Sequence, residues 1–215
     1  MIYRPITGPT RRRITYRINL ALALLLGLAL PACLAPVRAQ VQAPATVPAA
    51  VATRWDHRPE ATAWTTAMME ALQTDGAAML AMVPEDVQDY CPGYTTATPA
   101  QRAAFYVAFF SGLARFESTW NPRASGAGGR YRGLLQISPG TARAHDCALG
   151  DGGLYDGATN LACAVRVANA AITRDGVLTR ASGGIAADWP PLRTPSRRAE
   201  IAAFTRGLPQ CAHGT

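Results

Sequence analysis

The chain has 215 residues, of which 49% are hydrophobic and 16% charged, and its formal net charge is +7. The positive charge is unevenly placed, because six of the 21 basic residues lie in residues 1–39, which contain no acid. The rest of the chain carries 15 arginines against 14 acids. A nearly neutral body gives little support to nucleic-acid binding, so we expect no nucleic-acid partner.

Residues 1–39 have the layout of a secretory signal peptide. Arginines precede an apolar run from Ile18 to Leu30, and Val37-Arg38-Ala39 follows with small residues at its first and last positions. As a helix, this run of about 13 residues would be about 20 Å long, which is too short to span about 30 Å of hydrocarbon. We therefore expect residues 1–39 to be removed and the protein to be exported to the periplasm.

An alternative processing route starts at Cys33. The sequence Leu30-Pro31-Ala32-Cys33 resembles a lipobox, which would make the protein an outer-membrane lipoprotein. The protein would have the membrane as a partner only if it were anchored in this way. Residues 40–54, rich in Ala, Pro, Gln and Val, are predicted to form a flexible lead-in.

Four cysteines remain after residue 39, at positions Cys91, Cys147, Cys163 and Cys211. An even number in an exported chain indicates two disulfides, with three possible pairings. We favour Cys147 with Cys163 and Cys91 with Cys211, and the alternative is buried free thiols. The spacings lack a CxxC pair and the histidines are scattered, so neither a metal site nor another cofactor is predicted.

The elements predicted after residue 54 are helices. Helical spacing of apolar residues indicates helices at 59–72 and 77–82, within an N-terminal helical extension at 55–97. The main domain is predicted at 98–215. It opens with a capping box at Thr98-Pro99-Ala100-Gln101, and the helix from Ala100 to about Ser118 is apolar nearly all round, which is typical of a buried central helix.

Asn121-Pro122 ends that helix, and a Gly-rich loop follows at 125–129. Ser138-Pro139 predicts another helix start, and further helices are predicted at 159–174 and 197–206. The sequence contains no internal repeat and no run of alternating strands. The predicted class is therefore mainly α.

Glu117 is the only acid between Asp89 and Asp146, and it lies near the end of the apolar helix beside Phe116 and Trp120. Burial and the negative end of the helix dipole both disfavour its ionised form. Cleavage of a glycosidic bond needs a carboxylic acid that is still protonated near neutral pH. Glu117 is thus a candidate catalytic acid.

The alternative is a glutamate in an ordinary ion pair with Arg115 or Arg132. A second carboxylate, which many glycosidases require, has candidates in Asp146, Asp151 and Asp156. No sequence motif places any of these three opposite the acid.

Three segments, at 116–122, 133–142 and 154–161, resemble successive motifs of the soluble lytic transglycosylase (SLT) family, which is similar in fold to goose-type lysozymes. The resemblance spans about residues 100–175 and keeps the order and spacing of the motifs. It implies a lysozyme-like helical domain with a buried central helix and a cleft. It also implies non-hydrolytic cleavage of the MurNAc-GlcNAc β-1,4 bond, giving 1,6-anhydromuramic ends.

The resemblance implies a role for each matching residue. Glu117 would be the acid and then the base, Ser118 and Gln136 would position the acid or the sugar, Leu135 would form an apolar wall of the cleft, and Asn160 would brace the site. The alternatives are structural: a helix-end hydroxyl for Ser118, a surface amide for Gln136, a core side chain for Leu135 and a helix cap for Asn160.

The chain departs from the family at 180–184. Where the family has Ala-Tyr-Asn, with a tyrosine that bonds the catalytic glutamate, this chain reads Arg-Ala-Ser-Gly-Gly. Tyr131 and Tyr155 are the candidates to replace that tyrosine. Trp189 is a candidate for stacking on a sugar face, and core packing is its alternative.

Three functions remain open at this point: a lytic transglycosylase, a lysozyme-like hydrolase that uses water, and a non-catalytic wall-binding or assembly factor. The expected partner is the glycan strand of peptidoglycan, with a cell-wall remodelling or secretion complex as a further possibility. Arg123, Arg130 and Arg132 are candidates for binding peptidoglycan carboxylates, and a solvated basic loop is the alternative.

Overall fold

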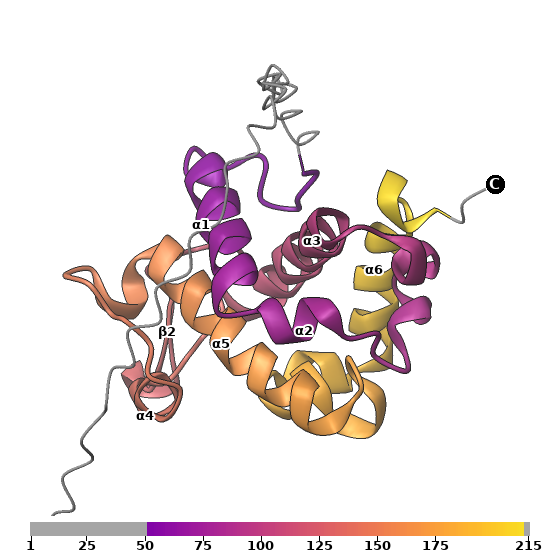
Figure 1. The fold of residues 1–215 in the computed structure, drawn as a ribbon. Helices are drawn as coiled ribbons and strands as arrows, with labels where there is room; N and C mark the ends of the chain where they lie inside the picture. Colours follow the sequence, from indigo (N-terminus) through magenta and orange to yellow (C-terminus); the bar gives the residue numbers. More distant parts are fainter. Residues whose placement is uncertain (1–50, 213–215) are drawn as a thin grey trace, which may run out of the picture. The chain divides into compact units, whose positions relative to one another are not determined.

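Six α-helices carry the fold of residues 51–212, the part of the chain that the computed structural model describes (Figure 1). They are α1 (Ala61–Thr74), α2 (Ala77–Ala81), α3 (Pro99–Ser118), α4 (Pro139–Ala144), α5 (Gly157–Asp175) and α6 (Pro195–Arg206). The predicted signal peptide, the candidate lipid anchor at Cys33 and most of the predicted lead-in lie outside the described residues. The mainly α class is confirmed.

Short elements connect the helices. Strand β1 (Ser125–Gly126) pairs antiparallel with β2 (Tyr131–Arg132), with Ser125 opposite Arg132. The 3₁₀ helices are Val87–Asp89, Pro92–Thr96, Ala127–Gly129, Gly153–Tyr155, Arg180–Ser182, Gly184–Ala187, Pro190–Arg193 and Pro209–Cys211. The β-hairpin is too short to give a run of alternating residues, which is why the sequence did not predict it.

Helix α3 is the buried central helix that the sequence predicts. The backbone N–H of Thr98 donates to the side chain of Gln101 at 2.8 Å, and the N–H of Gln101 donates to the Thr98 hydroxyl at 3.3 Å, so the capping box is confirmed. Its middle, from Phe105 to Ala114, is buried throughout. The helix ends where Thr119 adopts a left-handed conformation, which leaves Glu117 in its last turn.

Residues 55–97 share one core with the rest of the described chain. Helix α1 packs against α5 and α3, and α2 packs against α5. Helix α1 buries Trp64, Met68 and Leu72, and Trp64 meets Trp55 edge-on with ring centroids 5.9 Å apart. The segment is therefore built into the fold that holds α3 in place.

Two helices begin earlier than the sequence suggested. Helix α5 begins at Gly157, because the carboxylate of Asp156 accepts the N–H of Thr159 at 2.8 Å and caps the helix. Helix α6 begins at Pro195, since proline is tolerated in the first turn of a helix. Both predicted starts were two residues late.

Two disulfides are present, with the favoured pairing. Cys91 is bonded to Cys211, with a Cα–Cα distance of 4.4 Å, and Cys147 is bonded to Cys163, with a Cα–Cα distance of 5.2 Å. The alternative of free thiols is wrong for these four residues. Disulfides persist in oxidising compartments, so the pair points to an exported protein. Within residues 51–212, none of the helices has the length and apolar character needed to cross a membrane.

Candidate active site

Glu117 lines a cavity of about 550 Å³ between the end of α3, the β-hairpin and the start of α6. Its other lining residues come from the hairpin region and from the segment that leads into α6: Tyr131, Gln136, Asp188, Trp189, Pro190, Pro191, Thr194 and Arg197. A cavity of this size is typical of a small-ligand site. Three of the predicted site residues, Tyr131, Gln136 and Trp189, therefore lie around the same cavity as Glu117.

The carboxyl group of Glu117 is poorly solvated. Its Oε1 atom is buried and has no hydrogen-bond partner among the described residues. Burial raises the pKa of Glu117 from 4.5 to about 7, and the positive charge of Arg197 opposes this rise. The side chain thus holds its proton near neutral pH while lining an open cavity, as a general acid must.

The alternative of an ion pair at Glu117 is wrong. Arg115 instead pairs with Glu200. Arg132 donates from Nε to the carbonyl oxygen of Gly129 at 3.1 Å, and its guanidinium lies 5.7 Å from the ring centroid of Tyr155. Both arginines are thereby engaged away from the acid.

Gln136 connects the cavity to the hairpin loop. Its Nε2 donates to the carbonyl oxygens of Gly133 at 2.9 Å and Ala124 at 3.2 Å. A side chain at Gly126 would collide with the Gln136 amide, so a larger residue at this position of β1 would displace that amide. Gln136 itself has a φ of 48°, an uncommon conformation that the surrounding contacts must hold.

Asn160 braces the loop that carries Gln136. It is fully buried in α5, and its Oδ1 accepts the N–H of Leu135 at 2.9 Å. Its Nδ2 donates to the carbonyl oxygens of Arg132 and Leu154, at 2.9 and 3.0 Å. The side chain thus satisfies three backbone groups and does not act as a helix cap.

Two predicted cleft residues lie largely inside the protein. Leu135 is fully buried and does not line the cavity, so its implied role as a cleft wall is corrected to a core role. Trp189 lines the cavity but is only 4% exposed. Its Nε1 donates to the Leu135 carbonyl oxygen at 2.8 Å, and its ring meets Phe110 edge-on. Trp189 therefore forms a packed wall of the cavity.

Ser118 and Tyr155 do not line the cavity. The hydroxyl of Ser118 donates to the Ala114 carbonyl oxygen at 3.2 Å, as expected for a helix-end hydroxyl. The hydroxyl of Tyr155 donates to Ser125 at 3.4 Å. Tyr131 does line the cavity and is 40% exposed, but no tyrosine in residues 51–212 bonds Glu117. The motif tyrosine that the chain lacks is not replaced by an equivalent hydrogen bond.

The structure adds Asp188 and Arg197, which the sequence did not single out. Partial desolvation raises the pKa of Asp188, and His145, Arg174 and Arg193 oppose the rise. Glu117 and Asp188 are thus two carboxyls with raised pKa values that line the same cavity. Neither residue belongs to a recognisable motif, and only the fold brings them to the cavity.

The earlier candidates for a second carboxylate do not line the cavity. Asp156 caps α5, and Asp146 and Asp151 lie outside the cavity lining. Within the described residues, no group of three or more His, Cys, Asp or Glu side chains is placed to hold a metal ion.

Comparison with known proteins gives structural relatives. No protein-family model and no curated sequence matches the chain. The solved structures that match include the wild-type Bdellovibrio protein DslA, 27% identical, with a TM-score of 0.67 over 75% of this chain and 98% of that one. A DslA variant with one glutamate changed to glutamine is 28% identical, with a TM-score of 0.68 over 74% of this chain and 97% of that one. The fold is thus mainly α and lysozyme-like, in agreement with the sequence-based expectation.

Proposed function

We propose that the chain is an exported enzyme that cleaves the glycan strands of peptidoglycan, with Glu117 as its general acid. The observation that carries this proposal is a carboxyl group whose pKa is about 7, lining an open cavity with one oxygen buried and unpaired. The lysozyme-like fold supports it, as does the resemblance of three sequence segments to the SLT family.

The first step is proton transfer. Glu117 gives its proton to the oxygen that joins two sugars, the bond from C1 of the muramic residue to that oxygen breaks, and the departing sugar keeps the proton as a hydroxyl. As that bond breaks, the carbonyl oxygen of the substrate's own 2-acetamido group bonds to C1, which gives a cyclic oxazolinium ion. Glu117 is then a carboxylate, and the charge of Arg197 stabilises it.

The second step restores the acid. The Glu117 carboxylate removes the proton from the muramic 6-hydroxyl, and that oxygen bonds to C1 as the bond from C1 to the acetamido oxygen breaks, which gives a 1,6-anhydromuramic end and restores the acetamido group. Water is not consumed, so one residue acting as acid and then base is sufficient.

The second candidate function is hydrolysis. Asp188 lines the same cavity as Glu117 and is the one observation that favours this candidate, because an inverting hydrolase needs a second carboxylate to activate water. In that reaction the product would carry a reducing end. A non-catalytic binding factor is the third candidate, and the absence of the motif tyrosine is its support.

Mass spectrometry of digested sacculi separates the three functions. The wild-type chain is expected to release fragments with anhydro ends, and the Glu117→Gln variant to release almost none. The Asp188→Asn variant is the matched control, since it also replaces a carboxylate in the cavity, and its products should still be anhydro ends. Reducing ends that disappear with Asp188→Asn would establish the hydrolase, and binding without release would establish the binding factor.

We also propose that the protein works in the periplasm. The two disulfides and the signal-like residues 1–39 support this location. Cell fractionation is expected to place the wild type and a Cys33→Ala variant together in the soluble periplasmic fraction. Membrane attachment of the wild type that Cys33→Ala abolishes would establish the lipoprotein alternative.

A further inference from the structure

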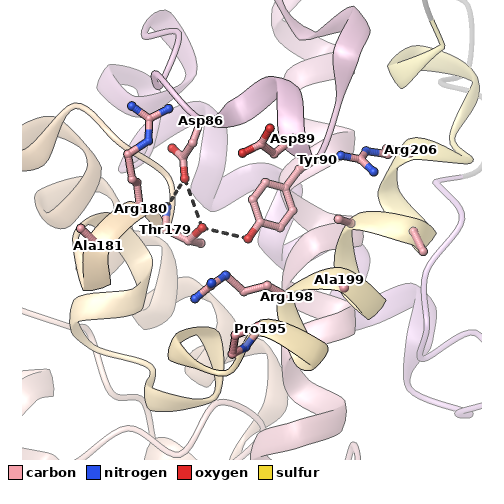
Figure 2. Close-up of a pocket in the computed structure, with 12 residues that line it drawn as sticks. Asp86, Asp89, Tyr90, Thr179, Arg180, Ala181, Pro195, Arg198, Ala199 and Arg206 are labelled. Carbon is pink, nitrogen blue, oxygen red and sulfur yellow. Dashed lines mark hydrogen bonds between the residues drawn. The ribbon is translucent and has the colours of Figure 1, made fainter.

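A second cavity, of about 410 Å³, lies on another side of the start of α6 (Figure 2). Thr194 and Arg197 line the cavity of Glu117, whereas Pro195 and Arg198 line this one. The two cavities have no lining residue in common. The second cavity is therefore a separate candidate binding site.

A chain of hydrogen bonds in its wall fixes the direction of one hydroxyl group. The buried carboxylate of Asp86 accepts the Thr179 hydroxyl at 3.1 Å, and the Thr179 oxygen lies 2.8 Å from the Tyr90 hydroxyl (Figure 2). Because Thr179 has a single hydroxyl proton, Tyr90 must be the donor to Thr179. The lone pairs of the Tyr90 oxygen are then left to accept a hydrogen bond. Burial raises the pKa of Tyr90, so the phenol keeps its proton.

Charges of both signs surround this hydroxyl. Arg198 uses Nη1 to donate to the Leu192 carbonyl oxygen at 2.9 Å, which leaves its other donors free, and Arg206 makes no side-chain hydrogen bond within residues 51–212. Asp89 is an exposed acid of the same lining, and it has no ion-pair partner in the described chain. In Figure 2 the ring of Tyr90 lies between the Asp89 carboxylate and the Arg198 guanidinium. The cavity thus offers donors and acceptors together.

We infer that this cavity binds a zwitterionic ligand of the amino-acid class, such as a free amino acid or the end of a short peptide. Arg198 and Arg206 would hold the ligand's carboxylate, since guanidinium groups form strong charge-assisted bonds with carboxylates. Asp89 and the Tyr90 oxygen would accept its ammonium group. A multiply charged anion such as phosphate fits less well, because Asp89 repels it. The inference does not depend on the chemistry at Glu117.

NMR titration of the full mature chain with the dipeptide alanyl-alanine tests the inference. The dipeptide is expected to shift the amide signals of Thr179 and Ala181 saturably. The same dipeptide with an amidated C-terminus or an acetylated N-terminus should bind more weakly, and so should inorganic phosphate at equal ionic strength. Equal binding of phosphate, or no saturable shift with the dipeptide, would overturn the inference.

Two variants locate the binding. Arg206→Ala is expected to weaken dipeptide binding about tenfold, because a charge-assisted hydrogen bond is lost. Arg143→Ala is the control, since it removes the same charge from an exposed position outside the cavity and should change nothing. Asp89→Asn should weaken binding of the dipeptide and strengthen binding of phosphate. Equal affinities in Arg206→Ala and Arg143→Ala, or an Asp89→Asn variant that leaves both ligands unaffected, would refute the assignment.

Discussion

Two acidic side chains in this protein have buried carboxyl oxygens, and the surroundings of these oxygens differ. Asp86 is 4% exposed, and its carboxylate accepts the N–H groups of Leu178 and Thr179 and the Thr179 hydroxyl. Glu117 has a buried oxygen without any partner in the described chain, and burial raises its pKa to about 7. Donors stabilise a carboxylate, whereas their absence favours the protonated acid. The raised pKa of Glu117 therefore comes from desolvation without hydrogen-bond donors that would compensate for it.

The Glu117→Gln variant should produce the largest change in activity. The amide has nearly the same shape as the acid but cannot give a proton, and general acid catalysis typically contributes about 10²- to 10⁴-fold. We expect the rate of glycan release to fall by this factor, with the circular dichroism spectrum unchanged. A folded variant with the wild-type rate would show that another group supplies the proton.

The same change of acid to amide at Asp86 should affect stability. Asp86→Asn turns an NH₂ group toward backbone donors that the carboxylate satisfied, and leaving such buried groups unpaired costs about 3 kcal/mol. Urea unfolding should show this loss in the free energy of unfolding, while the folded variant releases glycan at the wild-type rate. A loss of activity without a loss of stability at Asp86 would remove the contrast between the two carboxyls.

The sequence predicted the helices well because their signals are local, and it predicted the two disulfides because four cysteines leave only three possible pairings. The capping box at Thr98 marks the start of α3 by residue type and spacing, and both cysteine pairs match the favoured connectivity. The predicted starts of α5 and α6 are two residues late. Apolar residues do not recur at helical spacing before Asp156 and Thr194, so the spacing did not mark these two positions as helix starts. Helix boundaries depend on capping contacts, which the spacing of residues along the sequence predicts only in part.

The candidate site was only partly predictable. Glu117 stood out as a lone acid at the end of an apolar helix, and the structure places it in a cavity. Asp188 and Arg197 reach that cavity from a segment about 70 to 80 residues further along the chain, and no motif surrounds them. Leu135 and Ser118 are next to Gln136 and Glu117 in sequence, yet their side chains point to the core and to the helix backbone. Adjacency in the motif does not fix which side chains face the cavity.

The pH dependence of cleavage tests the pKa of Glu117 directly. Since the acid form is the active one, kcat/KM should be constant below pH 7 and fall about tenfold per unit above it. Removing the positive charge with Arg197→Ala should move this fall to higher pH, because Arg197 lowers the pKa of Glu117. Arg143→Ala, at an exposed position outside the cavity, should leave the profile in place. A fall near pH 4.5 would mean that the acid is not desolvated.

The smallest expected effect is a gain in stability. The folded state raises the pKa of Glu117 from 4.5 to about 7, so it binds a proton that the unfolded chain releases between these values. The contribution of this group to stability is therefore complete below pH 4.5 and is lost as the pH rises through 7. Glutamine is always neutral and avoids this loss. At pH 8.5 the Glu117→Gln variant should be about 1 to 3 kcal/mol more stable than the wild type, and at pH 4 the two should be equal.

Glu200→Gln is the control for that comparison. Glu200 pairs with Arg54 and Arg115. At pH 8.5 the free energy of unfolding of Glu200→Gln should therefore fall by up to about 1 kcal/mol, whereas that of Glu117→Gln should rise. Urea unfolding of the three proteins at both pH values measures the difference. A loss of stability in Glu117→Gln at pH 8.5 would show that the Glu117 carboxylate has stabilising partners in solution. An acid that is stabilised in its ionised form would be a poor proton donor at neutral pH.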